Sequence, residues 1–135
     1  MTVEALCFVD TNVLIYALDA SDPKSAIAEH LIEQSPTLSV QVINEVVSVQ
    51  TKKLRRPMCD ALTVAAYLMQ RCRVVALTVA DVELSHQLIT DHNFSMWDSL
   101  IIASALNANC TALYSEDMQH GRIVHGKLTI QNPFL

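Results

Sequence analysis

Residues 8–16, with the sequence FVDTNVLIY, decide the fold of this chain. The apolar start of this segment ends abruptly in Asp10, Thr11 and Asn12, and apolar residues resume at once. This pattern predicts a buried strand, a tight turn and the start of a helix. In open α/β folds, ligands bind in the crevice beyond the carboxyl ends of the strands. Asp10 is therefore a candidate metal ligand or general base, unless it only caps the helix that follows.

Outward from this segment, strand-like and helix-like runs alternate along the chain. The predicted strands are Ala5–Val9, Thr37–Val40, Val74–Leu77 and Ala112–Tyr114, with a weaker one at Leu128–Gln131. The predicted helices begin at Asp22-Pro23, cover Val42–Leu54 and about Pro57–Gln70, and open at Thr78-x-x-Asp81 and Ser95-x-x-Asp98, which resemble capping boxes. This order predicts right-handed crossovers and a mainly parallel sheet with helices on both faces.

Length and composition suit one folded domain over residues 1–135. Apolar residues make up 51% and charged residues 17% of the chain, which is enough for a full hydrophobic core. No apolar run approaches the ~20 residues of a membrane span, and no secretory signal is visible. With four scattered cysteines that we expect to be reduced, this predicts a cytoplasmic protein and no membrane partner.

A net charge of −5 argues only weakly against a nucleic-acid partner, because the distribution of charge matters more than the sum. Four of the nine basic residues lie within five positions: Lys52, Lys53, Arg55 and Arg56. This basic cluster could bind RNA phosphates. It could also be a solvated helix end whose cations complement the helix dipole, and the residue pattern alone favours that interpretation.

Four acidic residues stand where they could share one site: Asp10, Glu45, Asp98 and Asp117. Asp10 and Asp117 each follow a predicted strand, and parallel strands bring their carboxyl ends to one edge of the sheet. Each residue also has a purely structural interpretation. Asp117 could be a turn residue, and Asp98 could be the capping partner of Ser95.

Glu45 is unusual because its helical neighbours Val42, Val46 and Val49 are apolar, and no basic residue follows it at i+3 or i+4. It needs a partner elsewhere or a metal, unless it is half-exposed at the edge of the apolar stripe. Several carboxylates at one edge would repel one another without a cation between them. Mg²⁺ and Mn²⁺ prefer oxygen ligands, and two such ions could activate water for phosphodiester cleavage.

Three segments in order resemble the motifs of PIN domains. Residues 8–16 resemble the opening motif, and MWDSLIIA at 96–103 and LYSEDMQHG at 113–121 resemble later motifs of the VapC-type toxin branch. The closing NPF at 132–134 is similar to the ending of that branch. The resemblance implies a Rossmann-like three-layer α/β/α sandwich with a central, mainly parallel sheet. It also implies a metal-dependent ribonuclease, usually a homodimer, that a cognate antitoxin protein holds inactive.

The acidic residues of the family carry over onto Asp10, Glu45, Asp98 and Asp117. The supporting polar residues of the same motifs are Thr11, Asn12, Ser115 and Glu116. We therefore expect an endoribonuclease using Mg²⁺ or Mn²⁺, with the three aspartates holding the metals and Glu45 ligating a metal or orienting the attacking water. An aspartate-nucleophile phosphatase would usually have a second aspartate where this chain has Asn12. A non-toxin RNA-processing nuclease and a catalytically weak binding subunit stay open.

Two apolar features have competing interpretations. Trp97 could stack on a base, but its place beside an apolar helix start favours the core. Met58, Leu62, Ala65, Ala66 and Met69 form a helical stripe that we expect to be core and also dimer surface.

Overall fold

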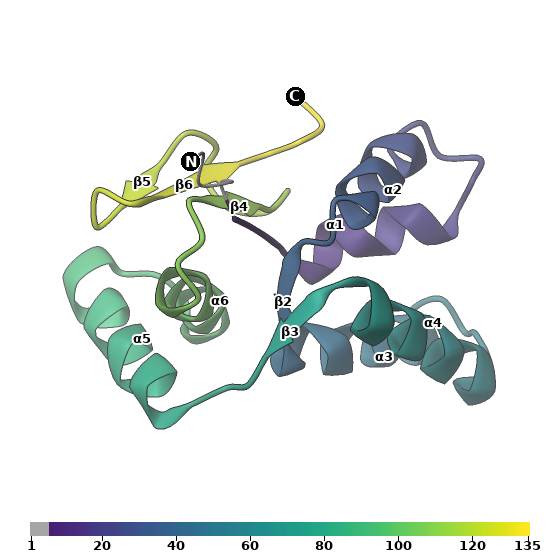
Figure 1. The fold of residues 1–135 in the computed structure, drawn as a ribbon, viewed down its shortest axis with the longest axis horizontal. Coiled ribbons are helices and arrows are strands. Elements are labelled where there is room, and N and C mark those ends of the chain that lie inside the picture. Colours follow the sequence, from purple (N-terminus) through teal and green to yellow (C-terminus); the bar gives the residue numbers. More distant parts are fainter. Residues whose placement is uncertain (1–5) are drawn as a thin grey trace, which may run out of the picture.

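A six-stranded sheet forms the centre of the molecule (Figure 1). The computed structural model describes residues 6–135. The strands are β1 (Cys7–Val9), β2 (Thr37–Ser39), β3 (Arg73–Val75), β4 (Ala112–Tyr114), β5 (Ile123–Val124) and β6 (Leu128–Gln131). They lie in the order β3-β2-β1-β4-β6-β5, and only β5 pairs antiparallel with its neighbour. The predicted, mainly parallel sheet is confirmed.

Helices cover both faces of this sheet. They are α1 (Thr11–Ile15), the 3-10 helix η1 (Tyr16–Leu18), α2 (Ser25–Glu33), α3 (Val40–Lys52), α4 (Met58–Arg71), α5 (Val79–His92) and α6 (Met96–Asn107). In Figure 1, α1 to α4 lie on one side of the sheet and α5 and α6 on the other. The chain forms the three-layer α/β/α sandwich that the resemblance implied, and the direction of winding changes between β1 and β4.

Most element boundaries agree with the prediction within a few residues, and the differences have local causes. The helix expected from Asp22 begins only at Ser25, because the Asp22 carboxylate accepts a hydrogen bond from the Lys24 amide and closes a turn first. The helix expected at Val42 begins at Val40, since Ser39 is the cap. Strand β3 ends at Val75, and the Ala5 end of the first predicted strand lies outside the described residues.

The two predicted capping boxes have different outcomes. At the start of α5, Thr78 and Asp81 each accept a hydrogen bond from the backbone amide of the other, which completes the box. At the start of α6, Ser95 accepts from the Asp98 amide, at 3.1 Å. The return bond from the Ser95 amide to the Asp98 carboxylate is not among the hydrogen bonds of residues 6–135. The carboxylate of Asp98 is therefore not used as a cap.

The core lies on both faces of the sheet, where Phe8, Leu38, Leu113 and Ile130 are fully buried. The expectation of a core tryptophan is wrong, because Trp97 is 61% exposed. It stands in the first turn of α6, ahead of Ser99, where the buried face of that helix begins.

The helical stripe on α4 is also mostly outside the core. Met58, Leu62 and Met69 are each more than half exposed. Of the predicted stripe, Ala65 is buried as expected, and helix α4 packs it inward together with Ala61 and Leu68. The four cysteines are free, and no helix within residues 6–135 is long and apolar enough to span a membrane.

Candidate active site

The reversal of the winding brings two acidic segments together. Strands β1 and β4 are parallel neighbours, with Val9 opposite Tyr114, and the Asp10 amide donates to the Tyr114 carbonyl at 2.9 Å. Asp10 follows β1, and Asp117 lies three residues beyond β4. Both therefore stand at the carboxyl edge of the sheet, at the topological switch point where α/β folds bind ligands.

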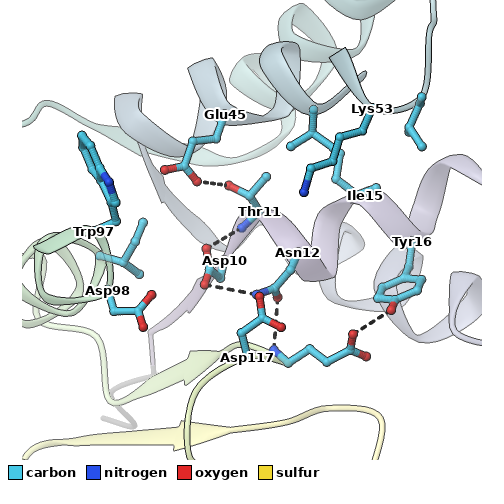
Figure 2. A pocket seen from close by; sticks show the side chains of 14 residues that line it. Asp10, Thr11, Asn12, Ile15, Tyr16, Glu45, Lys53, Trp97, Asp98 and Asp117 are labelled. Carbon is cyan, nitrogen blue, oxygen red and sulfur yellow. Dashed lines mark hydrogen bonds between the residues drawn. The ribbon is translucent and has the colours of Figure 1, made fainter. Parts of the chain in front are cut away.

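A cavity of about 460 Å³ opens at this edge (Figure 2). Its walls include all four predicted acidic residues, Asp10, Glu45, Asp98 and Asp117, and we refer to it as the acidic cavity. Thr11, Asn12 and Glu116 line it as well. The four acidic residues come from the β1–α1 junction, from α3, from the start of α6 and from the loop after β4.

Asp10 is the most deeply placed carboxylate, with 7% of its surface exposed. It accepts hydrogen bonds from the Thr11 amide at 2.7 Å and from the Ser115 hydroxyl at 3.0 Å. Burial nonetheless raises the pKa of Asp10 to about 6, and the negative charges of Glu45 and Asp98 act in the same direction. Asp10 caps α1, and its neutral hydrogen-bond donors do not offset the cost of burying its negative charge. The residue can therefore serve both as a helix cap and as a metal ligand.

Asn12 connects the two acidic segments. Its side-chain amide lies 3.4 Å from an oxygen of Asp10, 3.3 Å from the Ser115 hydroxyl and 3.1 Å from an oxygen of Asp117. Its side-chain carbonyl accepts from the Glu116 amide at 3.1 Å. Figure 2 shows Asn12 between Asp10 and Asp117. Asn12 therefore holds the loop after β4 in register with the end of β1.

Glu45 is held by two neutral donors. The Thr11 hydroxyl donates to one carboxylate oxygen and the Gln41 amide to the other, each at 2.8 Å. This fixes the side chain of Glu45 over the acidic cavity without neutralising its charge. Gln41 was not predicted as a partner of Glu45, although a position four residues earlier in a helix is a known signal for such a pair.

Asp98 faces the acidic cavity from the start of α6. Burial raises the pKa of Asp98, the Ser95 hydroxyl lowers it, and the charges of Asp117 and Glu45 raise it again. The negative charges of Asp117 and Glu45 are therefore close enough to disfavour ionisation of Asp98.

Glu116 differs from these four residues. Lys24 contacts one of its carboxylate oxygens at 2.5 Å, and the Tyr16 hydroxyl donates to the other at 2.7 Å. These two donors hold the pKa of Glu116 below its ordinary value. The sequence analysis missed Lys24 and Tyr16, because contacts over about a hundred residues leave no local pattern.

The four residues of the basic cluster, Lys52, Lys53, Arg55 and Arg56, have different surroundings in the structure. Lys53 lines the acidic cavity, and Lys52 lines a neighbouring one. Arg56 instead donates to the side chain of the buried Gln50 and so ties the α3–α4 connection to α3. Arg55 is exposed and has a left-handed backbone, with φ of 56°.

The chemistry of the donors fits Mg²⁺ or Mn²⁺. Among the described residues, the lining of the acidic cavity offers carboxylate, amide and hydroxyl oxygens together with the Lys53 ammonium, and no imidazole or thiol. Within residues 6–135, no three acidic, histidine or cysteine side chains already converge as a ligand group. The carboxylates instead line the walls of an open cavity, and Mg²⁺ commonly keeps several waters and binds directly to only one or two carboxylates.

The PIN domain family model matches residues 7–125, so this chain belongs to the PIN domain family. A search of curated proteins finds no match. Among solved structures, the fold is similar to VapC20 of Mycobacterium tuberculosis, a toxin that cleaves the sarcin–ricin loop, at 23% identity and a TM-score of 0.65 over 82% of this chain and 89% of that one. It is also similar to a toxin–antitoxin complex from Klebsiella pneumoniae, at 19% identity. The TM-score is 0.70, and the match covers 94% of this chain and 97% of that one. DNA-bound VapBC from Salmonella typhimurium is similar at 13% identity, with a TM-score of 0.72. That match covers 96% of this chain and 99% of that one.

Proposed function

We propose that this PIN domain is an endoribonuclease that uses Mg²⁺ or Mn²⁺, and that it is the toxin of a VapBC-type toxin–antitoxin pair. The observation that carries the proposal is the set of four carboxylates around one cavity at the switch point of the sheet. Three of them, Asp10, Glu45 and Asp117, accept hydrogen bonds from neutral side chains. These donors are Ser115, Thr11, Gln41 and Asn12. Such a set is typical of a site that a divalent cation completes.

In this proposal, Asp10, Asp98 and Asp117 hold the metal, which would supply positive charge to the phosphate and acidify bound water. Glu45 ligates a metal or orients the attacking water, for which its two fixed hydrogen bonds preorganise it. The oxygen of a water molecule would bond to phosphorus in line with the departing 3′-oxygen while the water proton passes to a nearby base. The P–O3′ bond would break, and the 3′-oxygen would take up a proton from solvent. The products are a 5′-phosphate and a 3′-hydroxyl.

The regulatory half of the proposal is an antitoxin protein that blocks this site in the cytoplasm. It is supported by the fold similarity to VapC and VapBC proteins. Four carboxylates also offer a negative target to a basic segment of a partner. The exposed Met58, Leu62 and Met69 of α4 support a homodimer, since apolar groups gathered on a helix surface are typical of interfaces.

The direct test is cleavage of single-stranded RNA by the purified protein. We expect cleavage with Mg²⁺ or Mn²⁺ and none with EDTA. Expression in the native host should stop growth, and Asp10→Asn should abolish that effect. Co-expression of the cognate antitoxin, which we expect to be a small protein encoded by the adjacent reading frame, should relieve it.

Other outcomes of the test favour the alternatives. Cleavage in vitro without any growth effect would favour a non-toxin RNA-processing nuclease. RNA binding without metal-dependent cleavage would favour a catalytically weak binding subunit. If the parent and Asp10→Asn impair growth equally, the growth defect comes from overexpression and not from nuclease activity.

A further inference from the structure

A second cavity adjoins the acidic one. It has a volume of about 710 Å³ and is bounded by α3 along its length, by the start of α6 and by the segment after β3. We refer to it as the side cavity, and its lining includes Val40, Asn44, Lys52, Leu77 and Leu100. Glu45 and Trp97 line both cavities, so the two cavities adjoin at this pair of residues.

Trp97 is the only tryptophan of the chain, and its side chain stands at the junction of the two cavities. Figure 2 shows it at the end of the acidic cavity nearest Asp98 and Glu45, away from Tyr16. Its 61% exposure leaves a large aromatic surface in water. Val40 and Leu77 of the side cavity are also exposed, at 41% and 37%. Such a surface beside a charged site is a feature that packing of the core does not explain.

We propose that the side cavity is a nucleobase subsite, in which Trp97 stacks on the base next to the cleaved phosphate. This inference rests on the proposed ribonuclease function. Aromatic side chains beside a groove that holds the backbone are a general means of binding single-stranded nucleic acid. Val40, Leu77 and Leu100 supply an apolar surface for the base, and Asn44 supplies a polar group at its edge.

The distribution of positive charge supports RNA as the occupant. Lys53 lines the acidic cavity and Lys52 lines the side cavity, so each cavity has one cation that could contact a phosphate of the strand. The Arg56 side chain, by contrast, is engaged by Gln50. Lys53 and Lys52 are therefore the basic side chains of the cluster that remain available to an RNA backbone lying across the two cavities.

Because Trp97 is the sole tryptophan, the intrinsic fluorescence of the protein reports on this subsite directly. The experiment uses full-length protein with Asp117→Asn, which prevents cleavage during the titration. The probes are a short oligoadenylate and an abasic strand with the same number of phosphates. We expect oligoadenylate to quench the tryptophan emission and to bind more tightly than the abasic strand.

Three variants in the same background separate stacking from general effects on the surface. Trp97→Ala should weaken binding of oligoadenylate, followed by anisotropy of a labelled strand, about 5- to 150-fold, the effect of losing one stacked base. Trp97→Phe should retain most of the affinity. Met96→Ala is the matched control, because Met96 is the adjacent residue, is 55% exposed and lines neither cavity. It should bind like the background protein.

Equal affinity for the two probes, or equal affinity of Trp97→Ala and the background protein, would overturn the subsite. Metal-dependent cleavage by the parent would then still support the nuclease. Trp97-dependent binding without metal-dependent cleavage by the parent would support the subsite and overturn the nuclease. If the adjacent small protein quenches Trp97 and oligoadenylate does not, the side cavity is a protein-docking surface and the inference is wrong.

Discussion

Glu116 has a basic partner in the structure, whereas no ion pair among the described residues involves the other four carboxylates of the acidic cavity. Glu116 is paired with Lys24 and Tyr16, and its pKa is lowered. Asp10 receives only neutral donors, and burial raises its pKa to about 6. The protein can therefore supply a cation to a carboxylate at this edge of the sheet. Within residues 6–135, no ion pair joins a basic side chain to Asp10, Glu45, Asp98 or Asp117, although Lys53 lines the same cavity. This difference is what the proposed divalent cation would explain.

The largest expected effect is on catalysis. Asp98→Asn should reduce RNA cleavage at least ~100-fold, because the site loses a charged metal ligand while the amide keeps the size of the side chain. The measurement is the initial rate of cleavage with Mg²⁺. Asp60→Asn is the matched control, since Asp60 is also an acidic residue in the first turn of a helix but lies outside the acidic cavity. Unchanged cleavage by a folded Asp98→Asn protein would make Asp98 a purely structural residue.

The next effect is on stability without metal. Asp10 titrates near pH 6 in the folded state and near 3.8 ordinarily, so between about pH 4 and 6 the folded protein holds a proton that the unfolded chain has lost. The free energy of unfolding should therefore fall as pH rises through this window. Asp10→Asn should remove this fall and raise the metal-free stability near pH 7 by roughly 1–3 kcal/mol.

Chemical denaturation in EDTA at pH 4.5 and pH 7.5 measures this effect as the difference between the parent and the variant. Glu116→Gln is the control, because we expect it to change the free energy of unfolding in the opposite direction. The lowered pKa of Glu116 contributes stability that is present above its unfolded pKa, so this variant should lose stability at neutral pH. The same pH dependence in the parent and Asp10→Asn would contradict the account of the acidic cavity.

The smallest effect concerns the basic cluster. Lys52→Gln with Lys53→Gln should weaken RNA binding and reduce the slope of log affinity against log salt by about one for each phosphate that is no longer neutralised. Arg55→Gln with Arg56→Gln is the paired comparison, and we expect the slope to change less, because these side chains line neither cavity. A slope that neither pair alters would make the whole cluster a solvated helix end.

The sequence was most informative where a function depends on the order of elements. Asp10 and Asp117 could be placed together because each follows a strand of a parallel sheet, and apolar runs locate strands. The two residues of β5 are too few to show any periodicity, so this strand was not predicted. The exposure of Trp97 was missed because the sequence shows which residues are apolar, and not where a helix begins to touch the sheet.

Interactions between distant segments were the part that the sequence could not show. Lys24 and Glu116 are 92 residues apart, and Asn12 and Asp117 are 105 apart. Neither pair leaves a local pattern, and each depends on how β1, α2 and the loop after β4 pack. The acidic residues could thus be named from the sequence and the resemblance, whereas the distinction between Glu116 and the other four needed the three-dimensional structure.

Direct binding of Mn²⁺ tests the central claim, that the uncompensated carboxylates hold a divalent cation. The measurement is isothermal titration calorimetry of Mn²⁺ into the parent, Asp10→Asn and Glu116→Gln without RNA. We expect the parent and Glu116→Gln to bind with similar affinity, and Asp10→Asn to bind at least ~10-fold more weakly or not at all. Absence of binding by the parent, or equal binding by the parent and Asp10→Asn, would contradict the claim.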